Sequence, residues 1–178
     1  MIIFMGVAGS GKSLQGKMLA DEHGLPWLST GEFLRMLISG RRRKEMLEGK
    51  LLDDHEIITL IQKILGIIDS QQEFVLDGFP RTPAQADWLL NQVKHKQLKI
   101  TKVVNLQAKP EIVRQRLIDR GRQDDYNEAI DERFKEYQET ILPIVEEFKD
   151  YGIEIVDIDG GQSLQAVHDQ IAEALALN

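Results

Sequence analysis

One loop constrains the fold of this 178-residue chain more than any other stretch, namely Gly6-Val7-Ala8-Gly9-Ser10-Gly11-Lys12-Ser13. It matches the pattern G-x-x-x-x-G-K-[ST], follows the apolar run Met1–Met5 and opens a helical pattern over Lys12–His23. At such a strand–helix junction, glycines let successive backbone N–H groups turn toward a phosphate chain. The helix N-terminus and Lys12 add positive charge, and the Ser13 hydroxyl is able to face Mg²⁺. The loop therefore predicts a nucleoside triphosphate site rather than an ordinary glycine-rich turn.

Short apolar runs alternate with helical patterns along the whole chain. The strand-like runs are Met1–Met5, Trp27–Ser29, Glu73–Asp77, Lys102–Gln107 and Ile153–Asp157. Such alternation predicts a single α/β domain over residues 1–178, with a five-stranded parallel sheet and helices on both faces, in three layers. Ligands bind sheets of this kind beyond the carboxyl ends of the strands, where the phosphate loop lies.

Three further helical patterns cover Asp54–Asp69, Pro83–Lys96 and Glu128–Lys149. The first has an apolar stripe wide enough to face a core. We expect Thr82 to cap the second, which has proline in its first turn. The stretch Asp125-Tyr126-Asn127-Glu128 matches a capping box and predicts that Asp125 caps the third helix. Pro143 should kink that helix.

Composition argues against several classes of protein. Cysteine is absent and the four histidines lack ligand spacing, so we expect neither disulfides nor a zinc site. The net charge of −7 argues against nucleic acid as a partner. No apolar run approaches the ~20 residues that cross a bilayer, and the apolar start is too short for a signal peptide. We therefore expect a cytoplasmic protein that binds no nucleic acid and no membrane.

A carboxylate follows the third predicted strand at Asp77, and Arg81 lies four residues further on. An aspartate at the end of a strand beside a phosphate loop is placed to hold Mg²⁺, directly or through its waters. The alternative is an aspartate that only ends a strand. Arg81 carries a permanent charge on a planar fork suited to phosphate.

Four arginines have a spacing that would bring them together around one tight turn between two helices: Arg116, Arg120, Arg122 and Arg133. Several arginines around one point would stabilise the charge that develops on a phosphoryl group in transfer. The alternative is a set of surface ion pairs with neighbouring aspartates, namely Asp119, Asp124, Asp125 and Asp131. The basic run Arg41–Lys44 has the composition of a solvated face.

These residues, in this order, resemble the adenylate kinase family of nucleoside monophosphate kinases, which have a P-loop NTPase fold. The segments that carry the resemblance are Gly6–Ser13, Leu28–Arg35, Gly49–Leu52, Phe74–Gln85 and Arg122–Asp125, with Arg133. The stretch Leu76-Asp77-Gly78-Phe79-Pro80-Arg81-Thr82 is the most specific of them. The resemblance covers nearly the whole chain and implies the reaction Mg·ATP + AMP ⇌ 2 ADP, catalysed by a monomer.

The resemblance also assigns site residues. It implies that ATP is bound by Gly9, Ser10, Gly11, Lys12, Ser13, Leu14, Arg116, Arg120 and Gln162. It implies an AMP site made of Thr30, Arg35, Lys50, Leu51, Leu52, Gly78, Phe79, Pro80, Arg81, Gln85, Arg122 and Arg133. The implied catalytic residues are Lys12, Arg81, Arg120, Arg122 and Arg133. Ser13 and Asp77 would hold Mg²⁺, partly through water. Within the domain, residues 29–58 would bind the monophosphate and residues 120–125 would form a rudimentary lid.

Thr30 and Gln85 both have the form typical of AMP-specific members, which favours AMP over UMP or CMP. A kinase for one of those pyrimidine monophosphates is the alternative in the same class. The chain departs from the family pattern at Ser13-Leu14, where Gly-Thr often follows the lysine, and between Arg120 and Arg122, where only Gly121 remains of the lid. Because the lid excludes water from the transfer, its reduction leaves a nucleotide-binding regulator or ATPase as a second alternative.

Overall fold

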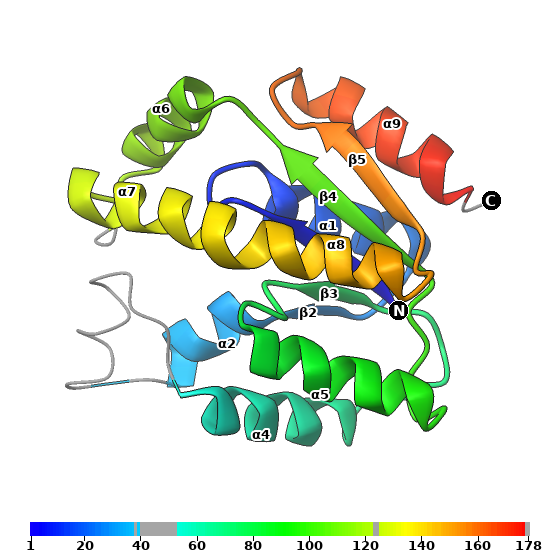
Figure 1. Ribbon diagram of the computed structural model, residues 1–178. Helices are drawn as coiled ribbons and strands as arrows, with labels where there is room; N and C mark the ends of the chain where they lie inside the picture. The colour runs from blue at the N-terminus through cyan, green and yellow to red at the C-terminus, as the bar shows by residue number, and fades with distance from the viewer. Residues whose placement is uncertain (38, 40–52, 123–124, 177–178) are drawn as a thin grey trace.

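A five-stranded parallel sheet with the strand order β2-β3-β1-β4-β5 forms the centre of the protein in the computed structural model (Figure 1). The structure describes residues 1–37, 39, 53–122 and 125–176. The strands are β1 (Ile2–Gly6), β2 (Trp27–Ser29), β3 (Val75–Asp77), β4 (Lys102–Gln107) and β5 (Ile155–Asp159). The predicted α/β fold with a five-stranded parallel sheet is confirmed.

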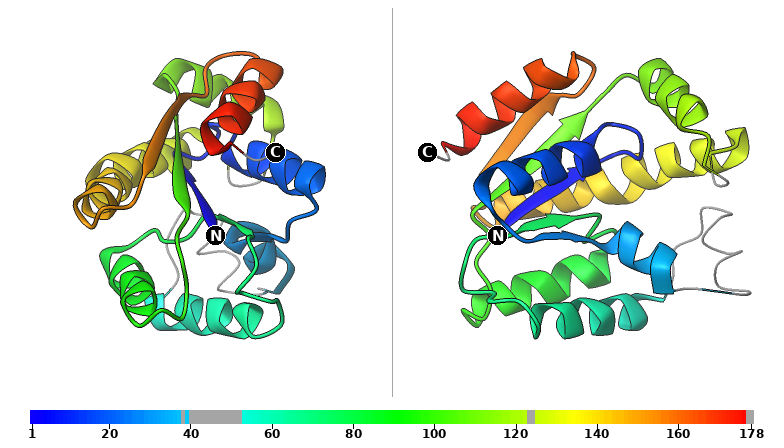
Figure 2. Two further views of the ribbon diagram at one scale, coloured as in Figure 1. Left: turned by 90° about the vertical axis from the view of Figure 1, so that its right-hand side faces the viewer. Right: turned by 180° about the vertical axis from the view of Figure 1, so that it is seen from behind.

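Helices cover both faces of this sheet, as the predicted three-layer arrangement requires (Figure 2). On one face lie α1 (Lys12–His23) and α9 (Leu164–Leu175), and on the other lie α4 (Asp54–Leu65), α5 (Pro83–Lys94) and α8 (Leu142–Asp150). Three more helices lie toward the carboxyl ends of the strands: α2 (Thr30–Leu37), α6 (Pro110–Arg120) and α7 (Asn127–Glu136).

The central strand β1 contributes to the core on both sides of the sheet. Ile3 and Met5 pack toward α4, α5 and α8, whereas Ile2 and Phe4 pack toward α1 and α9. Successive side chains of a strand point to opposite faces, so an uninterrupted apolar run fits a strand that is buried on both. β1 then leads directly into the phosphate loop, which is thereby anchored at the centre of the sheet.

Several element ends differ from the predictions. Two strands have their predicted bounds, but the last strand begins at Ile155 rather than Ile153. The reason is that the N–H of Ile153 still bonds the carbonyl of Phe148 in the turn that ends α8. The helix predicted to reach Asp69 ends at Leu65, because Gly66 follows and glycine is a poor helix former.

The long helix predicted over Glu128–Lys149 is interrupted rather than continuous. A π-helical turn, η1 (Tyr137–Ile141), separates α7 from α8, and the N–H of Leu142 bonds the carbonyl of Tyr137 five residues earlier. Pro143 follows at once and has no N–H to give to an α-helical turn. The expected irregularity at the proline is therefore a π-helical turn placed just before it.

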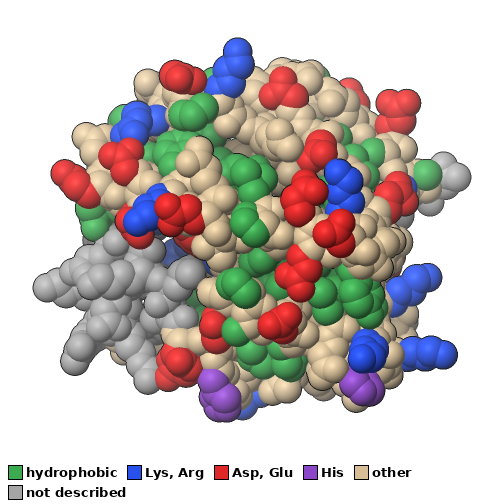
Figure 3. Space-filling model, in the orientation of Figure 1, with side chains coloured by type: hydrophobic (Ala, Val, Ile, Leu, Met, Phe, Trp, Pro, Cys, Tyr) green, Lys and Arg blue, Asp and Glu red, His purple; other side chains and the backbone are tan. Residues whose placement is uncertain are grey.

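The face that carries α7 and α8 presents acidic side chains spread among basic and apolar ones (Figure 3). This mixture agrees with the net charge of −7. In residues 1–37, 39, 53–122 and 125–176, no helix is long and apolar enough to cross a membrane.

Candidate active site at the carboxyl edge of the sheet

A cavity of 420 Å³ opens beyond the carboxyl ends of the strands, between the phosphate loop and α2, α6 and α7. Most of the predicted site residues line it: Gly9, Gly11, Lys12, Ser13, Leu14, Thr30, Arg35, Asp77, Gly78, Arg81, Gln85, Arg116, Arg120, Arg122 and Arg133. They come from segments far apart in the sequence. The parallel topology brings these segments to one edge, as expected for ligand sites in such sheets.

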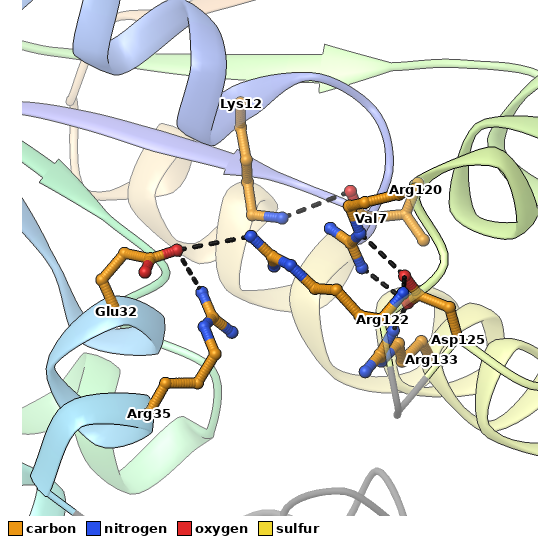
Figure 4. Close-up of polar contacts among 8 residues, drawn as sticks. All are labelled: Val7, Lys12, Glu32, Arg35, Arg120, Arg122, Asp125 and Arg133. Carbon is orange, nitrogen blue, oxygen red and sulfur yellow. Dashed lines mark hydrogen bonds and ion pairs between the residues drawn. The ribbon is translucent and has the colours of Figure 1, made fainter.

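The phosphate loop has the tight backbone that its glycines allow. Gly9 has a φ of +88°, and a Cβ there would approach the side chain of Leu117 to 2.8 Å. The part of the loop around Gly9 therefore packs against α6. The loop also turns back toward the ammonium of Lys12. Lys12 is buried, and its Nζ donates to the carbonyl of Val7 at 3.3 Å (Figure 4).

The charge of Lys12 is held in a poorly solvated place. Burial lowers the pKa of Lys12 from 10.5 to about 8, and the positive charges of Arg81 and Arg120 act in the same direction. The carboxylates of Asp77 and Glu136 act against them. Among the residues that the structure describes, no carboxylate forms an ion pair with Lys12, so a bound phosphate would stabilise its charge by supplying the negative partner.

Asp77 ends β3 directly beside the phosphate loop. Its Oδ2 accepts a hydrogen bond from Ser29 Oγ at 2.9 Å, while Oδ1 is buried and has no hydrogen-bond partner among the described residues. The register pairs Ser29 with Asp77 across β2 and β3, which explains the contact. Asp77 and Ser13 line the same cavity, and their carboxylate and hydroxyl oxygens are a donor set that suits Mg²⁺, which needs only one or two protein oxygens besides phosphate and water. The residues present thus fit the expected ion.

Arg120 and Arg133 converge on the carboxylate of Asp125, which is 0% exposed (Figure 4). Arg120 donates from Nε at 2.8 Å and from Nη2 at 2.6 Å, and Arg133 donates from Nη1 at 3.0 Å. Burial alone would raise the pKa of Asp125, but these hydrogen bonds and charges outweigh it and hold the pKa below its usual range. Asp125 therefore holds the two arginines together, and both line the cavity.

The prediction that Asp125 caps the third helix is wrong. Tyr126 precedes α7, and no side-chain hydrogen bond caps the described start of that helix. Asp125 instead accepts from the backbone N–H of Arg122 at 3.2 Å as well as from two arginine side chains. Charged donors bind a carboxylate more strongly than a neutral backbone N–H does, so the arginines win the contact.

A second carboxylate, Glu32, lies on the opposite side of the cavity. Its Oε1 accepts from Arg35 Nη2 at 2.6 Å and lies 3.4 Å from Arg122 Nη2. The hydrogen bond from Arg35 lowers the pKa of Glu32, as do the charges of Arg35 and Arg122. Arg122 thereby links the α6–α7 side of the site to α2.

A further part of the cavity lining is joined by short hydrogen bonds and consists of Thr30, Gly78, Arg81 and Gln85. Thr30 Oγ1 donates to the carbonyl of Gly78 at 2.7 Å, and a Cβ on Gly78, whose φ is +79°, would come within 2.8 Å of that hydroxyl. Arg81 Nε donates to the same carbonyl at 3.2 Å. Gln85 Oε1 accepts from the backbone N–H of Arg81 at 2.9 Å. The close packing at Gly78 explains why glycine is needed there.

The remaining predicted residues lie elsewhere. Ser10 is a buried residue of the loop itself. Phe79 and Pro80 are buried and line a smaller neighbouring cavity of 30 Å³, and Gln162 is exposed. Gln162 nevertheless lies near the site, since its carbonyl is 3.4 Å from Arg116 Nη2. Lys50, Leu51 and Leu52 lie outside the described residues, as do the basic run 41–44 and residues 123–124 of the predicted lid.

Sequence reasoning missed several residues that help to build the site. The cavity is also lined by the carboxylate residue Glu136 and by the apolar residues Leu34 and Ile57. Glu32 accepts a hydrogen bond from Arg35, which is itself a lining residue. Asp54, which is not one of the described lining residues, accepts a hydrogen bond from the side chain of Gln85. Spacing could have placed Glu32 on the same helical face as Arg35, three residues later. The contact between Asp54 and Gln85 joins two helices and has no local signal.

Comparisons with known proteins point to a single family. The sequence profile described as "Adenylate kinase" matches residues 4–153. A relative named "Adenylate kinase" from Corynebacterium urealyticum is 32% identical, and one of the same name from Prochlorococcus marinus is 34% identical; each comparison covers 98% of both chains. "Adenylate kinase 1" from Synechocystis is 35% identical over 93% of this chain and 91% of its own.

Proposed function

This chain belongs to the adenylate kinase family of phosphotransferases, and from that premise we propose that it transfers a phosphoryl group from Mg·ATP to AMP, giving two ADP. The observation that carries the proposal is the cavity that the phosphate loop shares with Arg35, Arg81 and the arginines of α6 and α7. The proposal is of a monomer, since the lining residues of this one chain include both the phosphate loop and the arginines that the transfer needs. The lack of cysteine fits the cytoplasm.

In this proposal the donor nucleotide lies along the phosphate loop. Its phosphates take hydrogen bonds from the backbone of residues 9–14 and the charge of Lys12, while Arg116 and Gln162 flank the base. Arg116 is supported in that place, because its Nη1 donates to the carbonyl of Gly160 at 2.7 Å. Mg²⁺, when bound with ATP, would neutralise charge on the phosphates, and Asp77 and Ser13 would hold it, partly through water.

The acceptor nucleotide lies against α2 and the segment Gly78–Arg81. Arg35 and Arg81 would bind the AMP phosphate, replacing the contacts that Glu32 and Glu136 now make with them. Thr30 and Gln85 would position the base. Since the AMP phosphate is already an anionic nucleophile at neutral pH, the site needs no general base.

Transfer then depends on alignment and charge. The space between donor and acceptor would be surrounded by five positive side chains that all line the cavity, namely Lys12, Arg81, Arg120, Arg122 and Arg133. Positive groups fixed in place before the reaction stabilise the charge that spreads over the phosphoryl oxygens at no cost in reorganisation. Arg120 and Arg133 meet this condition because Asp125 already holds them.

A coupled assay across AMP, GMP, UMP, CMP and dTMP tests the proposal. We expect ATP consumption to depend on AMP and to be fastest with AMP, because Gln85 and Thr30 suit adenine. A preference for UMP would contradict the use of these two residues. Consumption of ATP at equal rates with and without AMP would instead indicate an ATPase or regulator with a lid too small to exclude water.

The pH dependence of ATP use should report the state of Lys12. Burial lowers the pKa of Lys12 to about 8, so the lysine is mostly charged below this pH and mostly neutral above it. We expect kcat/KM for ATP to fall toward about tenfold per pH unit above that value. Bound phosphates raise the pKa, so kcat should hold to higher pH. In Lys12→Arg, whose guanidinium stays charged, residual activity should lack this inflection.

A further inference from the structure

The side-chain amide of Gln85 has a fixed orientation. Its Oε1 accepts from the backbone N–H of Arg81 at 2.9 Å, and its Nε2 donates to Oδ1 of Asp54 at 2.8 Å. A backbone N–H only donates and a carboxylate only accepts, so these partners themselves assign the oxygen and the nitrogen of the amide. Rotation by half a turn would place Oε1 against a carboxylate and Nε2 against a donor.

Asp54 is in turn held by a second contact. Thr82 Oγ1 donates to the same Oδ1 of Asp54 at 2.7 Å and accepts from the backbone N–H of Gln85 at 3.3 Å. These bonds form a closed ring that joins the start of α4 to the start of α5. The position of Asp54, and with it the orientation of the amide, therefore does not depend on a bound nucleotide.

Each end of the amide keeps one hydrogen-bonding position beyond this ring. An amide carries two N–H donors and two oxygen lone pairs, and among the described residues each end of Gln85 has one partner. Gln85 lines the cavity, whereas Asp54 is not one of the described lining residues and lies behind it. Gln85 can thus offer one donor and one acceptor to a ligand, in an order that Asp54 and the Arg81 N–H have already set.

The order of donor and acceptor distinguishes two kinds of purine. A 6-aminopurine presents an N6–H donor beside the N1 acceptor, whereas a 6-oxopurine presents an O6 acceptor beside the N1–H donor. A freely rotating amide would match either edge, since half a turn exchanges its donor and its acceptor. An amide that cannot rotate matches only one of them, and a site that leaves polar groups unpaired rejects the other.

We propose that Asp54 is a positioning residue that selects 6-aminopurine over 6-oxopurine monophosphates by fixing the orientation of Gln85. This role rests on the monophosphate site of the proposed function. Asp54 is not among the described residues that line the cavity, so it would act on the base through Gln85. It opposes the rotated amide through its negative charge, which would face Oε1.

The test compares AMP with IMP, which is nearly isosteric and differs at the edge that Gln85 would contact. In Asp54→Ala, the ratio of kcat/KM for AMP to that for IMP should fall about tenfold or more, because the variant lacks a hydrogen bond to a charged group that opposes rotation. The change should lie in the KM values rather than in kcat. Asp54→Asn keeps the side-chain volume but is able to donate to a rotated amide, so it should lower the ratio as well, and it replaces the alanine variant if that one does not fold.

Asp53→Ala is the matched control, because Asp53 caps the same helix from an exposed position through the N–H groups of His55 and Glu56. It should lower the melting temperature without changing the AMP-to-IMP ratio. An unchanged ratio in both Asp54 variants, or an equal fall in Asp53→Ala, would overturn the positioning role.

Calorimetric titration of each variant with AMP and with IMP, without ATP, separates the two proposals. If the wild-type protein binds AMP over IMP through Asp54 but phosphorylates neither, the proposed reaction is wrong and the positioning role holds. If it phosphorylates AMP and discriminates equally with and without Asp54, the reaction holds and the positioning role is wrong.

Discussion

Replacing Lys12 by methionine should lower the turnover of ATP and AMP by about 10³-fold while leaving the fold intact. The ammonium is the charge that the phosphate loop surrounds, and it lines the cavity at the point where loop, Asp77 and arginines meet. Neutral methionine of similar length would leave the transferred phosphoryl group without this cation. Steady-state ADP formation, measured at saturating nucleotide, reads the loss directly.

Thermal unfolding of the same variant should show no loss of stability. Lys12 is a buried cation whose lowered pKa reflects the cost of burying its charge, and an apolar side chain of similar volume avoids that cost. Lys17→Met is the matched control, since Lys17 lies exposed on the same helix. Near-normal ADP formation by Lys12→Met, or an equal loss in Lys17→Met, would remove Lys12 from the proposed mechanism.

The sequence was sufficient to predict the sheet and the phosphate loop because both depend on local patterns. Strands buried on two faces are runs of apolar residues, and β1 is such a run from Ile2 to Met5. Thr82 was correctly predicted to cap α5, since its hydroxyl accepts from the N–H of Gln85 three residues later. Contacts within four residues of each other leave a signal in the sequence.

Element ends and long-range polar contacts were predicted less well. The bounds of β5 depend on how α8 ends, and the form of the break before Pro143 depends on packing that no residue pattern records. Asp125 shows the limit most clearly. A capping pattern and an arginine anchor need the same residue type, and only the folded chain brings Arg120 and Arg133 to one carboxylate.

Asp125→Asn should cause the second large loss, lowering kcat by about 10²-fold with smaller changes in KM. An asparagine keeps the volume but turns one oxygen into an N–H₂ group, which meets an arginine donor instead of accepting from it. Arg120 and Arg133 would then lose the common anchor that fixes them before the phosphoryl group arrives. Single-turnover measurements with saturating nucleotides isolate this loss from binding.

Asp131→Asn is the control for the removal of an aspartate that pairs with a neighbouring arginine. Its carboxylate pairs with Arg114 on the surface and is 63% exposed, so solvent screens the contact and kcat should stay within about twofold of the wild type. A comparable loss of kcat in the Asp131 variant would mean that general surface charge, and not the anchoring of two arginines, controls the rate.

The stability of Asp125→Asn should depend on pH in a direction that the structure sets. Because the pKa of Asp125 is lowered in the folded protein, the ionised carboxylate stabilises the fold above the unfolded value of 3.8. That contribution is about 2 kcal/mol at neutral pH, limited by the partial exposure of Arg120, and it disappears as the pH falls through the folded pKa. Urea unfolding of both proteins should therefore give a gap in unfolding free energy that is nearly constant from about pH 7 to about pH 5 and narrows as the pH falls below about 4. A gap that stays constant as the pH falls below about 4 would mean that the asparagine acts through packing, and the anchoring of Arg120 and Arg133 by charge would no longer explain the loss of turnover.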